Sequence, residues 1–176
     1  SVFCRLDDLR PTLVPTLVVL IALERARKDF EAARAYGARA LALADAGLEE
    51  AVVVDSAGTS AFHVGERPDE RSRTVAEWRG ITVDGAARQF VAGDFTRFDW
   101  VVAMDRSNAA NLQRLAPDAA AEARIHLLRS FDPDAGDALD VPDPYYGGSD
   151  GFQTVLAICE RGCAGLLRAM RERHDL

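Results

Sequence analysis

The sequence predicts an α/β fold, in which helices alternate with the strands of a parallel sheet. The chain has 176 residues, close to the size of one domain at roughly 150 residues. Short apolar runs that contain β-branched residues alternate with segments whose apolar residues have helical spacing. Ligands bind such sheets at the carboxyl ends of the strands, so the polar residues after each strand are the first candidates for chemistry.

Three short apolar runs are expected to form buried strands, at residues 52–55, 100–104 and 124–128. Each contains β-branched residues and ends at polar or turn residues, as strands covered on both faces do. The longest apolar run, 17–23, is far shorter than the roughly 18 residues that a membrane-spanning helix needs. We therefore expect no membrane-spanning segment and no membrane partner.

Two helices are expected to begin at capping residues, one at 70–79 after Asp69 and one at 108–115 after Asp105 or Ser107. Gly80 is a typical helix stop and would end the first of them.

The end of the chain predicts a long amphipathic helix. Its apolar residues follow the spacing i, i+3, i+4, i+7: Phe152, Val155, Leu156, Cys159, Cys163, Leu166, Leu167 and Met170. Another helix, rich in Ala, Arg and Glu, is expected at 24–46. Residues 116–124 and 132–150 are expected to be loops, and the second is long enough to suggest a function.

Composition excludes several classes of protein. The formal net charge is −7, the wrong sign for neutralising nucleic-acid phosphates, so we expect no nucleic-acid partner. Three cysteines, Cys4, Cys159 and Cys163, are too few for a disulfide framework and favour a reducing, cytoplasmic location. Cys159 and Cys163 fall on the apolar face of the last helix, where core packing is expected. The three histidines lack metal-ligand spacing, so no metal site is predicted.

The segment V-P-D-P-Y-Y-G-G at 141–148 holds one carboxylate, Asp143, between two prolines and beside two tyrosines. Proline fixes φ, so this backbone is expected to be stiff. One interpretation is a general acid whose proton is retained through partial burial. The other is an ordinary Pro-Gly turn with surface tyrosines.

Five sequence blocks occur in a specific order: V-D-S-A-G-T-S at 54–60, V-G-E-R-P-D-E-R at 64–71, A-R-Q at 87–89, D-F-T-R-F-D-W-V-V-A-M-D at 94–105 and D-P-Y-Y-G at 143–147. From about residue 48 onward, the chain thereby resembles the low-molecular-weight protein tyrosine phosphatases. The resemblance implies a single domain over 1–176, a four-stranded parallel twisted sheet flanked by helices on both faces. It also implies hydrolysis of protein phosphotyrosine or a small aryl phosphate without a metal or other cofactor, and leaves the oligomeric state open.

In this family a C-x5-R-S loop follows the first strand. Its thiolate attacks phosphorus, and its arginine binds the phosphate oxygens. Cys4 and Arg10 satisfy C-x5-R and would take these two roles. The resemblance makes Asp143 the acid that protonates the leaving phenolate and then activates water.

The resemblance also implies residues around the substrate. Phe62, Tyr145 and Tyr146 would bind the substrate beside the pocket, and Ser56 would support the catalytic loop.

The segment 1–47 departs from the family pattern. Asp7 and Asp8 stand inside the C-x5-R loop, where they would repel a phosphate dianion, and the serine after the arginine is missing. Cys4 also lies much farther from Asp55 than the family places these two residues. The histidine that braces the family's loop is absent, and Gly85 and Ala86 stand in its place.

Counting back from Asp55 without a gap puts the loop near residues 25–31, where no cysteine exists. A strand at 17–23 would then match the family's first strand, and Arg25, Arg27 and Lys28 would leave a basic anion site. A relocated loop, a degenerate loop and an error in the N-terminal sequence all stay open at this point.

Three functions follow from these patterns. The leading one is a phosphatase that works through a cysteinyl-phosphate. The alternative is a catalytically impaired phosphate-binding or interaction protein on the same scaffold. Arsenate reduction is the third, and it needs further cysteines near the nucleophile to take up oxidising equivalents.

Overall fold

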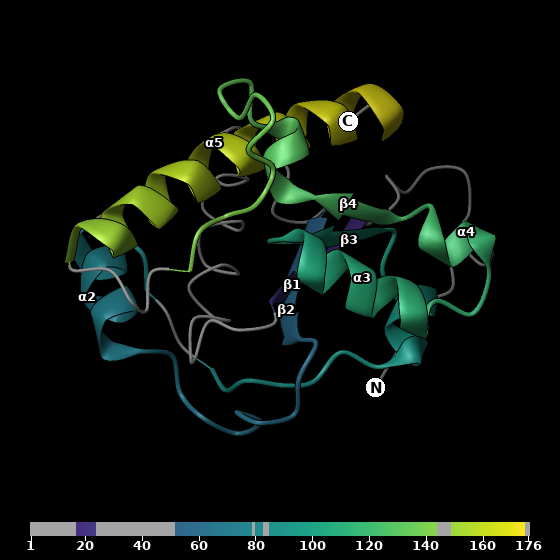
Figure 1. Cartoon of the computed structure of the whole chain (residues 1–176), viewed down its shortest axis with the longest axis horizontal. Helices are drawn as coiled ribbons and strands as arrows, with labels where there is room; N and C mark the ends of the chain where they lie inside the picture. Colours follow the sequence, from purple (N-terminus) through teal and green to yellow (C-terminus); the bar gives the residue numbers. More distant parts are fainter. Residues whose placement is uncertain (1–16, 24–51, 79, 83–84, 144–148, 175–176) are drawn as a thin grey trace.

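The structure is a computed structural model that describes residues 17–23, 52–78, 80–82, 85–143 and 149–174. Within this part of the chain, four parallel strands form one sheet in the order β2-β1-β3-β4 (Figure 1). The strands are β1 (Leu17–Leu23), β2 (Val52–Gly58), β3 (Trp100–Ala103) and β4 (Ile125–Leu127). The predicted α/β class with a parallel sheet is therefore confirmed for the described residues.

The register of β1 aligns the carboxyl ends of its two neighbouring strands. Leu23 of β1 pairs with Gly58 of β2, and Ala22 pairs with Ala103 of β3. The carboxyl ends of these three strands consequently meet at one edge of the sheet. β2 runs past its expected end at residue 55, because pairing with β1 extends the strand through small residues that read as a turn in the sequence.

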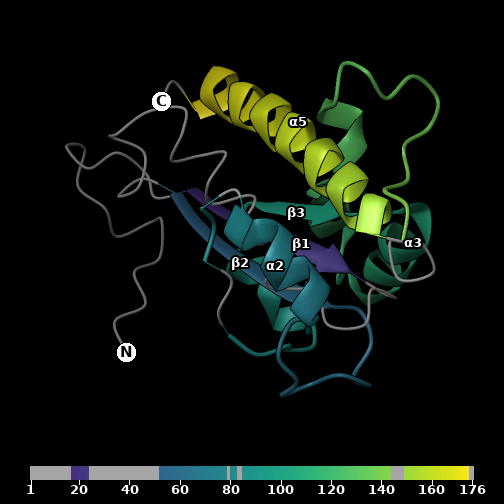
Figure 2. The same cartoon turned by 90° about the vertical axis from the view of Figure 1, so that its left-hand side faces the viewer.

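Helices cover both faces of the sheet. α2 (Glu70–Trp78) and α5 (Ser149–His174) share one hydrophobic core with the sheet, whereas α3 (Arg106–Leu115) and α4 (Ala119–Glu122) share another. In Figure 1, α5 crosses above β3 and β4 while α3 lies below β3, and Figure 2 shows α2 in front of β1 and β2. This two-sided burial explains why the β3 sequence is apolar throughout instead of alternating.

Side chains of β3 divide between the two cores. Trp100 and Val102 belong to the core shared with α5, and Val101 and Ala103 belong to the core shared with α3. All four are buried.

The predicted helix caps are confirmed. The Asp69 carboxylate accepts the Arg71 N–H at 2.8 Å at the start of α2. Gly80, with φ of 67°, follows the end of α2, and the Ile81 N–H reaches back to the Ala76 carbonyl.

Asp105, rather than Ser107, is the N-cap of α3. Its carboxylate accepts the Asn108 N–H at 2.7 Å. The helix therefore begins at Arg106, before the predicted start at residue 108.

Two loop predictions need correction. Segment 116–124 contains α4, whose N-cap Asp118 accepts the Ala121 N–H at 2.7 Å. This helix is about one turn long and too short for any hydrophobic periodicity to reveal it. The second predicted loop ends earlier than expected, because α5 already begins at Ser149; its described part, 132–143, forms neither helix nor strand.

The predicted closing helix is confirmed, and its small residues permit a close contact. Cys159 and Cys163 are buried in the core, and burial raises the pKa of the Cys163 thiol to about 12. Gly165 lies against η3 (Leu128–Phe131), where a Cβ would overlap the Phe131 carbonyl oxygen.

Two predictions fall partly or wholly on undescribed residues. The helix at 24–46 lies outside the described residues. The single domain over 1–176, with its atypical segment 1–47, stays a prediction for the same reason.

Candidate active site

The segment that carries Asp143 is anchored at the carboxyl edge of the sheet. The Val141 N–H donates to the Met104 carbonyl at 2.8 Å, directly after β3. Val141 itself is buried in the core shared with α5, so this point of the loop is fixed by packing as well. Asp143 follows two residues later. The predicted proton donor therefore comes from a segment tied to the edge where the strands end.

Asp143 is exposed, so the partial burial expected of it is wrong. The reason lies in the path of the chain: it leaves the core after Val141, and Pro142 is already exposed. The structure therefore fixes the position of the Asp143 segment at the carboxyl edge of the sheet but does not bury the Asp143 side chain.

An ion pair holds the same segment against α3. Asp140 accepts the backbone N–H of Arg106 at 2.9 Å and its guanidinium at 2.8 Å. The Arg106 guanidinium also reaches the Asp137 carbonyl at 3.4 Å, and Arg129 donates to the Asp140 carbonyl at 3.1 Å. Since a backbone and a side-chain donor of one residue bind one carboxylate, the contact fixes direction as well as distance.

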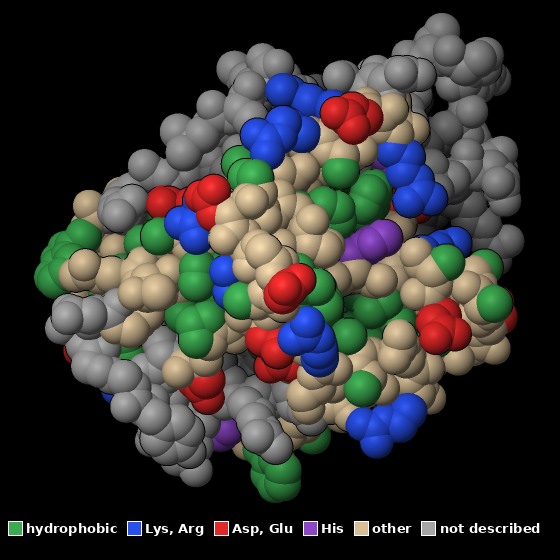
Figure 3. All heavy atoms as spheres, turned by 45° about the horizontal axis from the view of Figure 1, so that its top comes forward, with side chains coloured by type: hydrophobic (Ala, Val, Ile, Leu, Met, Phe, Trp, Pro, Cys, Tyr) green, Lys and Arg blue, Asp and Glu red, His purple; other side chains and the backbone are tan. Residues whose placement is uncertain are grey.

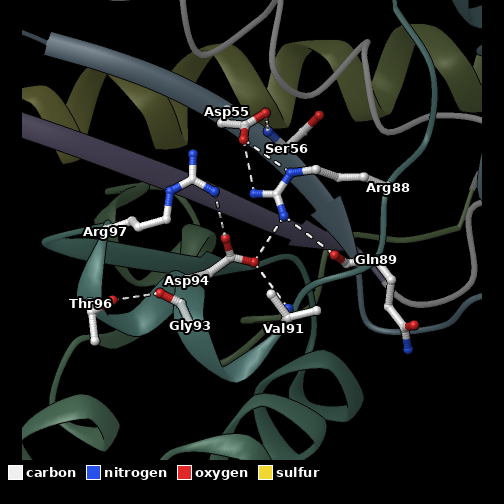
Figure 4. A network of polar contacts seen from close by, with 9 residues as sticks. All are labelled: Asp55, Ser56, Arg88, Gln89, Val91, Gly93, Asp94, Thr96 and Arg97. Atoms are coloured by element: carbon white, nitrogen blue, oxygen red, sulfur yellow. Dashed lines mark hydrogen bonds and ion pairs between the residues drawn. The ribbon is translucent and has the colours of Figure 1, made fainter. Parts of the chain in front are cut away.

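A second network holds the middle of β2 (Figure 4). Asp55 accepts the Ser56 N–H at 2.8 Å and the Arg88 Nε at 3.0 Å. The same guanidinium donates to the fully buried Asp94 at 2.8 Å, and Arg97 approaches Asp94 at 3.4 Å. Although burial opposes the shift, the two carboxylates raise the pKa of Arg88. Arg88 thus remains a cation between two anions.

The backbone around Arg88 also extends the sheet. The Gly58 N–H donates to the Arg88 carbonyl and the Phe90 N–H donates to the Gly58 carbonyl, both at 2.8 Å. Gly58 and Gln89 form an isolated parallel bridge. The end of β2 is therefore held on one side by β1 and on the other by segment 88–90.

Seven buried side-chain polar atoms of the described residues have no hydrogen-bond partner. Three of them are hydroxyl or amide oxygens in or after β2 and in α3, namely Ser56 Oγ, Thr59 Oγ1 and Asn108 Oδ1; the other four belong to Arg88, His126, Arg129 and Asp132. An unsatisfied buried polar group costs roughly 1–3 kcal/mol, so these positions favour a further polar contact. This supports the predicted role of Ser56 as support for a neighbouring loop, which stays a prediction.

Phe62 lies in the loop after β2 with 89% of its surface exposed. The loop is tied back by hydrogen bonds from the Gly65 N–H to the Ala87 carbonyl and from the Ala87 N–H to the Glu66 carbonyl. Gly65 adopts a φ of 84°, which few other residues adopt. The Phe62 ring is therefore exposed on a tied loop, and its role in substrate binding stays a prediction.

Four of the predicted site residues, Cys4, Arg10, Tyr145 and Tyr146, lie outside the described residues. The basic positions 25, 27 and 28 do so as well. What the structure does establish is the strand at 17–23, in the central position between β2 and β3. Cys4 precedes this strand in the sequence, whereas the family's loop follows its first strand.

Sequence reasoning missed Arg88, Asp94, Arg106 and Asp140. Arg88 and Asp94 stand within two of the blocks that carry the family resemblance, which marked their segments but not their pairing. Arg106 and Asp140 are 34 positions apart, and no local pattern links them.

The described residues show neither a membrane-spanning helix nor a metal-binding cluster. None of the described helices combines the length and apolar character that crossing a membrane requires. Among these residues no group of three or more His, Cys, Asp or Glu side chains is arranged to hold a metal ion. On the face drawn in Figure 3, basic and acidic side chains are interspersed.

The chain is similar to known phosphatases in sequence. The family model described as low molecular weight phosphotyrosine protein phosphatase matches residues 32–175. A low molecular weight protein-tyrosine-phosphatase of Streptomyces coelicolor is 50% identical over 132 residues, covering 74% of this chain and 80% of that protein. Low molecular weight protein-tyrosine phosphatase A of Mycobacterium tuberculosis is 44% identical over 128 residues, covering 72% and 76%.

Solved structures show the same likeness. A protein tyrosine phosphatase from Entamoeba histolytica, crystallised with Hepes in the active site, superposes with a TM-score of 0.80 at 32% identity. That match covers 90% of this chain and 98% of the other. YfkJ from Bacillus subtilis gives a TM-score of 0.78 at 31% identity, with 92% and 98% covered. The family-model match begins at residue 32, after β1 and after both Cys4 and Arg10.

Proposed function

Because the chain belongs to the low molecular weight phosphotyrosine protein phosphatase family, we propose that it hydrolyses protein phosphotyrosine and small aryl phosphates through a cysteinyl-phosphate. The observation that carries this proposal is the anchoring of the Asp143 segment to Met104 at the carboxyl edge of the sheet. A phenolate is a poor leaving group, so a fixed proton donor at this edge is what aryl phosphate hydrolysis requires.

The reaction has two steps. The Cys4 thiolate attacks phosphorus, the bond from phosphorus to the aryl oxygen breaks, and Asp143 gives its proton to that oxygen. Water then attacks phosphorus, the Asp143 carboxylate takes its proton, and the bond to sulfur breaks to release phosphate and thiolate. Arg10 binds the phosphate oxygens as a planar, bidentate partner in both steps.

The other proposed residues act on the substrate or on the loop. Phe62, Tyr145 and Tyr146 would contact the aromatic ring of the substrate, and the Ser56 hydroxyl would support the loop that holds phosphate. We propose no metal or cofactor, since the nucleophile, proton donor and anion partner are all side chains. A thiolate nucleophile works best in a reducing compartment, which favours the cytoplasm.

Hydrolysis of p-nitrophenyl phosphate tests the nucleophile. The unmutated protein should turn over, Cys4→Ser should abolish turnover, and Arg10→Lys should lose most of it, since a point charge cannot replace a bidentate fork. Alkylation of Cys4 by iodoacetate without loss of activity would contradict the assignment.

The proton donor is tested separately. Asp143→Asn should lower kcat for phosphotyrosine by roughly two to four orders of magnitude, and much less for an aryl phosphate with an acidic phenol. If the dependence of log kcat on leaving-group pKa is the same in the variant, Asp143 is not the general acid.

One observation favours a second candidate function, a phosphate-binding protein without turnover. β1 occupies the central position of the sheet, and the residues that directly follow it, 24–31, contain no cysteine. Under this alternative Arg25 and Arg27 bind the anion. Phosphotyrosine would then bind without hydrolysis, Cys4→Ser would leave binding unchanged, and Arg25→Ala with Arg27→Ala would weaken it.

The third expectation, arsenate reduction, loses its main requirement. Cys159 and Cys163 are both buried in α5, and the raised pKa of Cys163 keeps its thiol protonated. These thiols are therefore poorly placed to take up oxidising equivalents from a reaction at the sheet edge.

A further inference from the structure

We propose that Arg106 and Asp140 form a clasp that positions Asp143 for proton transfer. Neither residue contacts the substrate in this proposal; both act through the loop that carries the acid. The inference rests on the proposed function, in which Asp143 is the proton donor.

The clasp adds a second fixed point to the loop. The Val141 N–H bond to Met104 fixes one position of the chain, and a single anchor leaves the chain free to turn about it. Asp140, the preceding residue, is bound by the backbone and the guanidinium of Arg106 at 2.9 and 2.8 Å. Two adjacent anchors fix the direction in which the chain leaves the core.

The chain beyond the clasp is stiff enough to transmit this direction. Only Val141 and Pro142 separate Asp140 from Asp143; Val141 is buried, and the ring of Pro142 fixes its φ. A change in the backbone at Asp140 therefore moves Asp143, and a displacement of about 1 Å at a catalytic group can cost on the order of 100-fold in rate.

A different tether holds the far end of the same loop. Arg161 of α5 donates to the buried Asp132 at 3.1 Å and approaches Asp134 at 3.4 Å. Arg129 links the two ends of the loop 132–140, because it lies in η3 just before Asp132 and donates to the Asp140 carbonyl at 3.1 Å. The far tether buries a charge, whereas the clasp lies on the surface.

Exposure distinguishes positioning from general support of the fold. The side chains of Arg106 and Asp140 are 57% and 47% exposed. An ion pair this exposed contributes little to folding stability, so its loss should be visible mainly in catalysis.

The test compares rates across aryl phosphates whose phenols range from weakly to strongly acidic. Arg106→Ala and Asp140→Asn should each lower kcat for phenyl phosphate about two- to five-fold, the range that an exposed pair supports. For p-nitrophenyl phosphate the loss should be smaller, so the plot of log kcat against leaving-group pKa becomes steeper. KM should change little, and Arg106→Lys should recover part of the loss.

The matched control is Arg114→Ala, which removes another arginine of α3 that hydrogen-bonds within its own helix, to Asn111 and to the Ala110 carbonyl. It should leave the slope and kcat unchanged. Thermal unfolding of each variant should stay close to that of the unmutated protein, which shows that the rate loss is not partial unfolding.

Asp143→Asn measured beside these variants separates the two ways of failing. If it steepens the slope while Arg106→Ala and Asp140→Asn do not, the clasp is overturned and the proposed function stands. An unchanged slope in Asp143→Asn overturns the assignment of the proton donor and the clasp with it, whereas no turnover in the unmutated protein overturns the proposed function itself.

Discussion

Two carboxylates of the molecule, Asp94 and Asp140, are held in contrasting ways. Asp94 is fully buried, and its charge is met by Arg88 and Arg97. Asp140 lies on the surface and pairs with the exposed Arg106. A buried charge that loses its partner destabilises the fold strongly, whereas an exposed pair contributes little. The first arrangement therefore holds β2 at Asp55, and the second orients a surface loop with little effect on the stability of the fold.

The largest expected effect is on the buried network. Arg88→Met removes the charge that pairs with both Asp55 and Asp94, and it should lower the free energy of unfolding by about 3 kcal/mol. Urea unfolding measures this. Arg97→Met is the control, because Arg97 is exposed and lies 3.4 Å from Asp94, and it should cost below about 1 kcal/mol. Equal losses in the two variants would remove the distinction between buried and exposed pairs.

An intermediate effect is expected for the far tether of the loop. Arg161→Met leaves the buried Asp132 carboxylate without its guanidinium, at a cost of roughly 1.5–3 kcal/mol. Stability at neutral pH should fall accordingly, whereas Arg106→Ala should change it by less than about 1 kcal/mol.

The pH dependence of that tether has a defined sign. Although burial opposes it, hydrogen bonding from Arg161 lowers the pKa of Asp132 below its usual value. The stabilisation is therefore complete above the usual aspartate pKa, about 4, and is lost as pH falls through the folded-state value. Acid titration should show a smaller fall in stability below about pH 4 for Arg161→Met than for the unmutated protein. Parallel acid curves would contradict this account.

The smallest expected effect concerns His126 of β4, which stacks on Trp100 with ring centroids 4.9 Å apart. Burial, with a further contribution from Arg173, lowers the pKa of His126. Below about pH 6.5, His126 binds a proton in the unfolded chain more readily than in the folded chain. The free energy of unfolding therefore falls as the pH decreases from about 6.5 to the folded-state pKa of His126. His126→Phe, which keeps a ring against Trp100, should flatten stability between pH 7 and 5. An unchanged pH dependence of stability in His126→Phe would contradict this expectation.

Local patterns predicted much of the fold. The apolar run that became β3, the caps Asp69 and Asp105, and the helical spacing from Phe152 to Met170 each depend on neighbours in sequence. Pairing over long distances could not be predicted in this way. Arg88 pairs with Asp55, 33 positions away in the sequence, and this pairing depends on the folded path of segment 88–90.

The candidate site was predictable only in part. The position of the Asp143 segment at the sheet edge follows from strand order, but its exposure depends on where the chain leaves the core after Val141. Counting back from Asp55 under the family resemblance predicts the strand at 17–23, and the structure confirms it in the central position of the sheet, with Cys4 before it in the sequence.

The burial of Cys159 and Cys163 in α5 determines how the protein would respond to oxidants. A sulfenic acid on Cys4 is protected from further oxidation when a nearby thiol converts it to a disulfide. The other two thiols of the chain are enclosed in the core, and Cys163 remains protonated because its pKa is about 12. With Cys4 as the proposed nucleophile, peroxide is therefore expected to oxidise it to the sulfinic acid, unless a small external thiol caps it first.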